Sequence, residues 1–136
     1  MNVPDYGACI EIVAGWIAAG AELVPGKTLV LEPGLPPAPD GCVALFETGG
    51  TWNVDRAFQV WSLTIVVRAA RLADARALAM AAINAALDGY ADPGEAGKGA
   101  ILDLDLHSLP ALIGRDDRDR VMLQAGLTMT IHAPTD

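Results

Sequence analysis

The longest run of regular hydrophobic patterning in the chain covers residues 58–87. Its first part, Phe58–Arg68, alternates apolar and mixed positions and predicts a long strand. The core row of that strand is Trp61, Leu63, Ile65 and Val67. Leu72–Leu87 then repeats apolar residues at helical spacing and predicts an alanine-rich helix that Gly89 can end. A strand followed directly by a helix must bury one face of each, so this unit is expected to form the centre of the core.

The remaining pattern predicts the elements that cover this unit. An apolar stripe at helical spacing indicates a first helix over Asp5–Ala19, with Asp5 as its N-cap. Period-two alternation predicts four further strands, Thr28–Glu32, Cys42–Thr48, Ala100–His107 and Val121–Ile131. Gly49 and Gly50 are expected to end the second of these. The connecting segments are a proline-rich loop at residues 33–41, a loop at Thr51–Ala57, a flexible loop at Tyr90–Gly99 and a charged connector at Ser108–Asp119, whose apolar anchor is Leu109, Leu112 and Ile113.

The order of these elements is α-β-β-β-α-β-β, without an internal repeat or an alternating βαβ series. This order predicts a single α+β domain over residues 1–136, with a mainly antiparallel sheet of about four to five strands and both helices packed on one face. In each long strand one row is apolar and the other is polar or small, which is typical of a sheet with one covered face.

Charge and composition exclude several classes of function. The formal net charge is −8 and the nine basic residues are dispersed, which argues against a groove that grips nucleic acid. No stretch approaches the roughly 20 apolar residues of a membrane span. The N-terminus lacks the basic segment of a signal peptide, so none is expected. Cys9 and Cys42 are expected to be free, buried thiols in a reducing compartment.

Candidate chemistry is sparse. Asp103, Asp105 and His107 share one side of a predicted strand, and Glu47 is a further candidate from another part of the chain; these are suitable metal ligands. However, side chains at i and i+2 of a strand lie about 7 Å apart, so a solvated strand face is the favoured interpretation and no metal or cofactor is expected. Serine and histidine do not form a nucleophile–base arrangement, and we expect a protein that is not an enzyme.

Interaction surfaces are a better match to the residue types. Trp52 and Arg56 lie in a predicted loop, and both types are over-represented at interface centres. Trp52 could equally fold back onto the core. The outer row of the long strand is too apolar for plain solvent and too polar for a second core, which predicts a subunit–subunit surface. Its members are Val60, Ser62, Thr64, Val66 and Arg68.

Three parts of the chain together resemble the tail terminator and minor capsid proteins of long-tailed bacteriophages and related gene-transfer particles. These parts are the long strand running into the alanine-rich helix, the proline-rich connection, and residues 109–133, LPALIGRDDRDRVMLQAGLTMTIHA. In that family the loop before the last strand often reads P-x-x-[LI]-G-x-D-x-x-x-R. The matching positions here are Pro110, Ile113, Gly114, Asp116 and Arg120.

The resemblance implies a component of the virion that assembles in the bacterial cytoplasm. It implies a homo-hexameric ring that caps the tail tube, stops its polymerisation and docks the tail to the head connector. Partners would be the tail tube protein and the connector, while DNA passes through the ring without specific binding. A different head–tail neck or completion protein is the alternative. A small ligand-binding or enzymatic α+β domain centred on His107 is a third.

These expectations select two sets of residues. The candidate oligomer and docking interface is Trp52, Arg56, Val60, Ser62, Thr64, Arg68, Arg115, Arg118 and Arg120. Charge reversal at Arg118 or Arg120 is expected to impair assembly while the monomer stays folded. The candidate acidic lining of the ring, where like charge would repel the DNA phosphates, is Glu47, Asp103 and Asp105.

Overall fold

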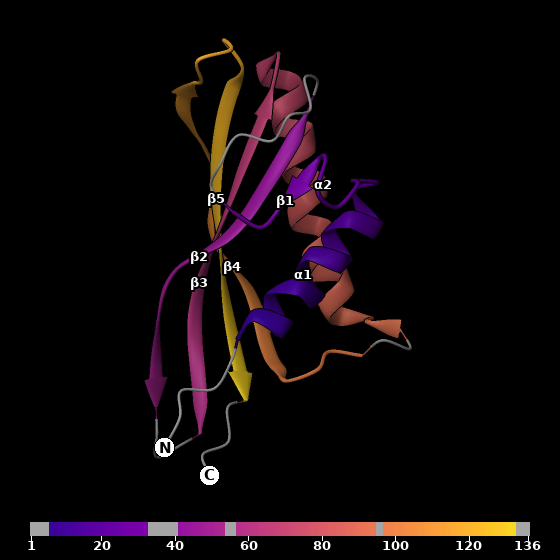
Figure 1. Cartoon of the computed structure of the whole chain (residues 1–136), viewed down its shortest axis with the longest axis vertical. Helices are drawn as coiled ribbons and strands as arrows, with labels where there is room; N and C mark the ends of the chain where they lie inside the picture. The colour runs from indigo at the N-terminus through magenta and orange to yellow at the C-terminus, as the bar shows by residue number, and fades with distance from the viewer. Residues whose placement is uncertain (1–5, 33–40, 54–56, 95–96, 133–136) are drawn as a thin grey trace.

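The structure is a computed structural model that describes residues 6–32, 41–53, 57–94 and 97–132. These residues form two helices and five strands in the predicted order (Figure 1). The elements are α1 (Gly7–Gly20), β1 (Leu29–Val30), β2 (Cys42–Asn53), β3 (Phe58–Ala69), α2 (Leu72–Ala91), β4 (Ile101–Arg115) and β5 (Val121–His132). The predicted cap at Asp5 and the proline-rich segment 33–40 lie outside the described residues.

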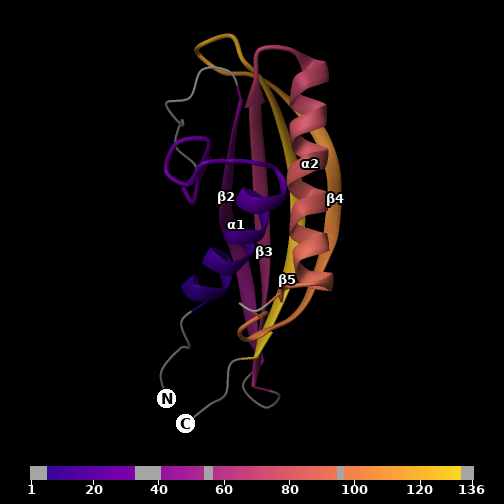
Figure 2. The same cartoon turned by 90° about the vertical axis from the view of Figure 1, so that its right-hand side faces the viewer.

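The strands form one sheet in the order β1-β2-β3-β5-β4. β1 runs parallel to β2, and every other neighbouring pair is antiparallel. Both helices lie on the same face, with α1 on the β1–β2 side and α2 on the β4 side (Figure 2). The predicted α+β class, with a mainly antiparallel sheet and helices on one face, is confirmed.

The core lies between this face and the helices. β3 and β5 pair without a bulge from Phe58↔His132 to Ala69↔Val121, so the apolar rows of the two strands lie side by side. Leu63, Ile65 and Leu127 in these rows are 1% exposed or less. Burial of each such side chain contributes about 1.5–3 kcal/mol relative to its exposure, so this pair of rows is a main source of stability.

Small residues let the two helices approach closely. A Cβ added at Gly20 would meet Ala85, and one added at Gly89 would overlap the Trp16 ring. Gly89 therefore lies inside α2, which continues to Ala91, and it does not end the helix as its residue type suggests. Its function is to leave room for Trp16.

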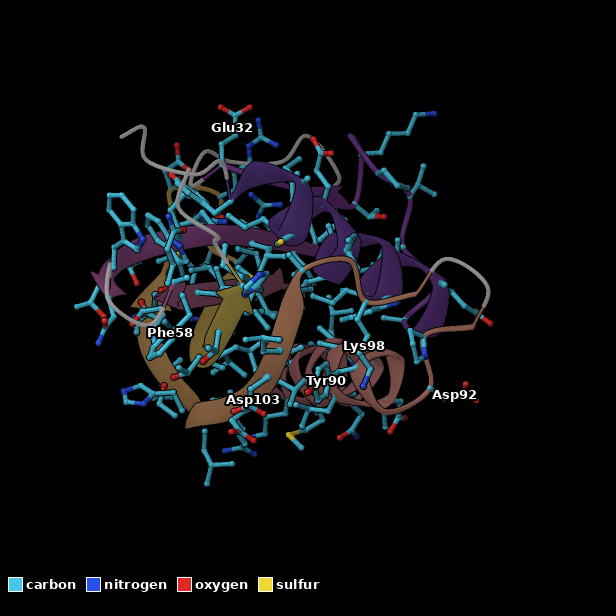
Figure 3. The ribbon with its side chains drawn as sticks, turned by 90° about the horizontal axis from the view of Figure 1, so that it is seen from below. Glu32, Phe58, Tyr90, Asp92, Lys98 and Asp103 are labelled. Carbon is cyan, nitrogen blue, oxygen red and sulfur yellow. The ribbon has the colours of Figure 1, made fainter. Side chains whose placement is uncertain are left out.

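The end of α2 is tied to the start of β4 by aromatic contacts. The Tyr90 hydroxyl donates a hydrogen bond to the Leu102 carbonyl, and Trp16 contacts the Tyr90 ring edge-on. The Lys98 Nζ lies 4.3 Å from the centre of the Tyr90 ring. Figure 3 shows Tyr90 and Lys98 together at this end of the molecule. Lys98 and Leu102, on the β4 side of this connection, are thus fixed against Tyr90 of α2.

Two strands are longer than their patterns predict. β2 continues through Gly49 and Gly50 to Asn53. A bulge at Thr48 shifts the register between Glu47 and Gly49, and pairing with β3 then continues; Gly49, beside the bulge, has φ +138°. β4 continues beyond His107 to Arg115, so most of the expected charged connector is strand. Pro110 fits there because β4 is an edge strand with several register shifts. Conversely, β1 is only two residues long.

Two glycine-to-alanine substitutions are expected to act in opposite directions. Gly89→Ala should lower the free energy of unfolding by about 1–3 kcal/mol, because the new methyl group forces Trp16 away from α2. Gly15→Ala, in α1 where an added Cβ would have no atom within 4 Å, should raise it by about 0.5–1 kcal/mol. Thermal and urea unfolding followed by circular dichroism measures both. Equal effects of the two variants would contradict the close helix contact.

Candidate interaction surfaces

The β4–β5 hairpin is closed by a turn built around one carboxylate. The backbone N–H of Asp116 donates to the carbonyl of Arg120 at 2.9 Å, and that of Asp119 donates to the carbonyl of Asp116 at 3.0 Å. Asp119 has φ +60°, which is the left-handed residue expected at the end of a three-residue hairpin loop. The turn therefore spans Asp116–Arg120.

The carboxylate of Asp116 organises this turn from inside. One oxygen accepts hydrogen bonds from the backbone N–H groups of Arg118 and Arg120, at 3.0 and 2.9 Å. The other accepts from Nε of Arg120 at 2.8 Å and lies 3.7 Å from Nε of Arg68. The three side chains are 4–10% exposed. Two guanidinium groups from different parts of the chain are thus joined by one buried carboxylate.

The pKa values of the neighbouring groups reflect this arrangement. Burial acts to raise the pKa of Asp116, but hydrogen bonds from Arg120 and Arg118 outweigh it, so the pKa of that carboxyl is lowered. The Cys42 thiol lies 3.5 Å from Nη1 of Arg120, and burial raises its pKa despite the two arginines. Cys9 and Cys42 are both buried thiols that form no disulfide within the described residues, as predicted.

These contacts correct the expected position of two arginines. Arg68 and Arg120 are 8% and 4% exposed, so they hold the hairpin from inside the protomer and do not lie on its surface. A reversed charge at Arg120 would face Asp116 in a buried site and is expected to disturb folding. Arg115 and Arg118 are exposed. The Arg115 side chain forms an exposed ion pair with Asp119 and donates a hydrogen bond to the Asp119 carbonyl at 2.8 Å. Both stay predictions as docking residues.

The other expected interface residues do not form one surface: Val60, Ser62 and Thr64 lie on the helix-free face, whereas Trp52 pairs with Gln59 in the helix-facing row. Thr64 is buried and donates a hydrogen bond to Thr48, whereas Val60 is half-buried and Ser62 is exposed. Trp52 is half-buried, and its Nε1 has no hydrogen-bond partner in the part of the chain that the structure describes. Arg56 lies outside the described residues. The open part of the predicted surface is therefore the end of β3 near Val60 and Ser62.

The three expected lumen carboxylates do not share a face. Glu47 pairs with the buried Leu63 on the helix side and accepts a hydrogen bond from the Tyr6 hydroxyl at 3.0 Å. Asp103 and Asp105 pair with Thr130 and Thr128, whose side chains point to the helix-free face.

Asp103 and Asp105 interact with each other on that face. A hydrogen bond and the charge of Asp103 raise the pKa of Asp105. The described residues contain no group of three or more His, Cys, Asp or Glu side chains that could hold a metal ion. The pair thus provides exposed negative charge on one face of the sheet.

The structure exposes one apolar surface that the sequence pattern does not predict. The side chains of Leu109, Leu112 and Ile113 are 68%, 61% and 48% exposed on β4. We call these three residues the β4 apolar edge. The pattern predicts an apolar anchor here, but β4 is the edge strand of the described sheet and these side chains remain largely exposed. The signal in the sequence is the apolar segment beside the proline and next to the charged turn.

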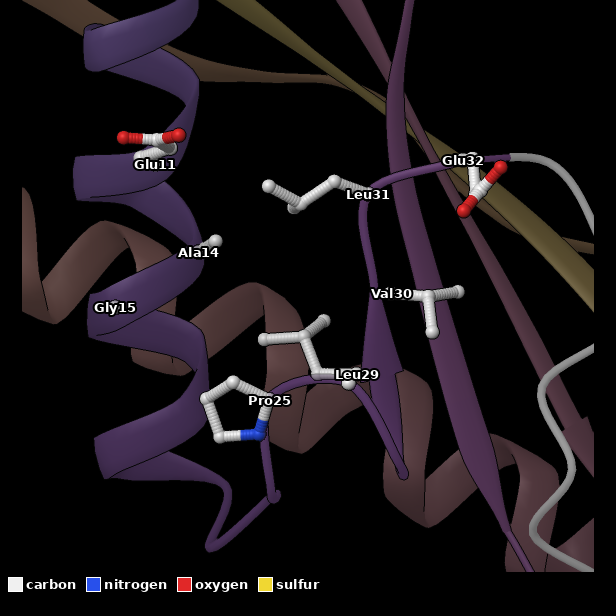
Figure 4. A pocket seen from close by; sticks show the side chains of 9 residues that line it. Glu11, Ala14, Gly15, Pro25, Leu29, Val30, Leu31 and Glu32 are labelled. Carbon is white, nitrogen blue, oxygen red and sulfur yellow. The ribbon is translucent and has the colours of Figure 1, made fainter.

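A second apolar surface lies at the opposite edge of the sheet. A pocket of about 470 Å³ separates α1 from the segment that contains β1, and we call it the α1/β1 groove. Figure 4 shows Ala14 and Gly15 of the helix facing Pro25, Leu29 and Leu31 across it. The carboxylates of its lining belong to Glu11 and Glu32.

Among the described residues, apolar side chains are exposed at both edges of the sheet, and exposed apolar patches of this kind mark candidate sites of contact with other proteins. A model of the bacteriophage tail terminator protein family matches residues 34–132, which is well over half of the chain. The chain therefore belongs to the bacteriophage tail terminator family and is a component of virion assembly. A search of curated proteins found no match. No helix among the described residues is long and apolar enough to cross a membrane.

The buried carboxylate of the hairpin predicts a specific pH dependence. Asp116→Asn should lower the free energy of unfolding at pH 7 by about 3 kcal/mol or more, because two buried guanidinium groups lose their counter-charge. Since the pKa of Asp116 is lowered by folding, its contribution is present above its unfolded pKa and declines as the pH falls below about 4. The difference in the free energy of unfolding between the wild-type protein and the variant should therefore become smaller at acidic pH.

Urea unfolding at a series of pH values measures this difference. The matched control is Asp117→Asn, one residue along in the same turn but exposed, which should change stability by less than about 0.5 kcal/mol. A difference that stays constant from pH 7 to about pH 2 would show that the charge of Asp116 does not stabilise the fold.

Proposed function

We propose that this protein is a ring-forming tail terminator. Its ring caps the growing tail tube, stops polymerisation and forms the surface that docks to the head connector. The observation that carries the proposal is the family match over residues 34–132, which includes β2 to β5 and α2. The protein functions by assembly and not by catalysis.

The arrangement of surfaces supports a ring. The β4 apolar edge and the α1/β1 groove lie at opposite ends of the strand order, so they can serve two different neighbours at once. Contacts of this head-to-tail kind generate a closed ring when the rotation between copies closes. We propose a homo-hexamer, in which the open end of the helix-free face, with Val60 and Ser62, and the exposed Arg115 and Arg118 supply further contacts.

The charge of the protein supports passage of DNA through such a ring. A net charge of −8 and dispersed basic residues disfavour binding to phosphates. Asp103 and Asp105 place two exposed carboxylates on the helix-free face and are the candidates for the lining. Glu47 lies on the other face, so in this proposal it does not line the same surface.

The proposed function is tested by arrest of tube growth. Purified protein added to the polymerising tail tube protein of the same particle should shorten the tubes, and each stopped end should carry a ring. Electron microscopy measures the length distribution and the ends. Bovine serum albumin at equal concentration controls for crowding. Tubes of unchanged length with bare ends would contradict the terminator function, and binding to the connector alone would favour another neck protein.

A further inference from the structure

The two edges of the sheet carry unlike but matching chemistry. The β4 apolar edge has three exposed aliphatic side chains and lies close to Arg115, the last residue of β4, and to Arg118 of the following turn. The α1/β1 groove is hollow, is lined mainly by apolar atoms, and has acidic side chains at Glu11 and Glu32. One surface therefore offers apolar projections with positive charge, and the other offers an apolar hollow with negative charge.

The β4 edge is built to dock through side chains. Its register against β5 shifts at four places, and Pro110 has no N–H group to donate. Bulges and proline on an edge strand prevent a second strand from adding to the sheet. Leu109, Leu112 and Ile113 nevertheless remain exposed, so the edge rejects a continuous backbone ladder while it presents an apolar surface.

The groove has room for such side chains. A Cβ placed at Gly15 has no atom within 4 Å, so the wall of α1 is open at this point. The opposite wall is formed by Leu29, which is buried, and by Leu31, which is 41% exposed. Figure 4 shows Leu31 between Glu11 and Glu32, with the two carboxylates on either side of it. An aliphatic side chain that enters the hollow is thus flanked by two acceptors for a cation.

The positive partners on β4 are available. The Arg115 side chain is 54% exposed, and its ion pair with Asp119 at 3.5 Å is exposed as well. Nη1 of Arg115 also donates a hydrogen bond to the Asp119 carbonyl at 2.8 Å, and this contact is exposed too. Exposed contacts of this kind contribute little, so Arg115 can exchange Asp119 for a carboxylate of another copy. Arg118 is exposed, and its backbone N–H, bound to Asp116, fixes the place of the residue in the turn.

We propose that the β4 apolar edge of one copy inserts into the α1/β1 groove of a second copy, with Arg115 and Arg118 facing Glu11 and Glu32. This proposal rests on the ring-forming function and names the contact that joins neighbouring copies. The contact is head-to-tail, because two bound copies together keep one free groove, on the first copy, and one free edge, on the second.

Two single variants test the direction of this contact. Gly15→Leu fills the groove and leaves the edge intact, whereas Leu109→Glu disrupts the edge and leaves the groove intact. Each variant alone should associate about tenfold more weakly than the wild-type protein. Mixed at equal amounts, they should form a 1:1 heterodimer, in which the intact edge of Gly15→Leu binds the intact groove of Leu109→Glu. This heterodimer should not grow, because its remaining groove and its remaining edge are the altered ones. Native mass spectrometry and light scattering measure the species.

Matched controls separate docking from general effects. Leu102→Glu replaces another exposed leucine of β4, 54% exposed at the far end of the strand, and should assemble like the wild-type protein. Circular dichroism verifies that each variant is folded. If Gly15→Leu or Leu109→Glu fails to fold, the charge variants Arg115→Glu and Glu32→Arg are used instead. Each charge variant alone should weaken association, and the variant with both changes should restore association.

The outcomes distinguish this contact from the proposed function. A mixture that stays monomeric, a Gly15→Leu variant that assembles normally, or a wild-type protein that stays monomeric at its highest soluble concentration would overturn the edge-into-groove contact. Tube arrest by the protein would still support the terminator function in those cases. Conversely, a heterodimer from the mixture without arrest of tube growth would support the contact and overturn the terminator function.

Discussion

The unbroken pairing of β3 with β5 is the interaction on which the rest of the structure depends. It aligns the apolar rows of two twelve-residue strands into one surface, and both helices pack on that surface. Because these strands occupy the centre, β2 and β4 must pair on their outer sides, and β1 adds only two residues beyond β2. The most apolar strands, β3 and β5, lie in the centre of the sheet, and the less regular β1 and β4 are therefore left at its edges.

This hierarchy explains which parts of the fold could be predicted. β3, β5 and α2 have strong periodicity because one face of each is buried. The ranges of β3 and β5 and the start of α2 agree with the patterns closely, whereas α2 continues past Leu87 to Ala91. The extensions of β2 and β4 could not be predicted, because local residue types argue against them. Gly49 and Pro110 usually end a strand, and only the partner strand and the edge position make them acceptable.

The candidate surfaces were predicted less well, since burial of a charge depends on tertiary contacts. The segment around Asp116 looks like a solvated run of mixed charge, yet its carboxylate joins Arg68 and Arg120 inside the protomer. The i,i+4 spacing of Asp116 and Arg120 across a short turn is the available signal. The sequence contains no such signal for the contact of Arg68 with Asp116, because Arg68 belongs to a strand that is remote in the sequence. The exposure of Leu109 could not be predicted either, because the sequence pattern does not show that β4 lies at the edge of the described sheet.

Apolar edges on a small protein create a conflict between assembly and aggregation. An exposed flat strand would pair with any other strand, and the bulges and Pro110 of β4 remove that option. What remains is recognition by side-chain shape and by charge, which requires a specific hollow. The net charge of −8 opposes random contact between copies, so a productive contact must bring opposite charges together locally. Among the described residues, the turn held by Asp116 places Arg115 and Arg118 beside the β4 apolar edge, which makes correct folding of this turn a condition for selective association.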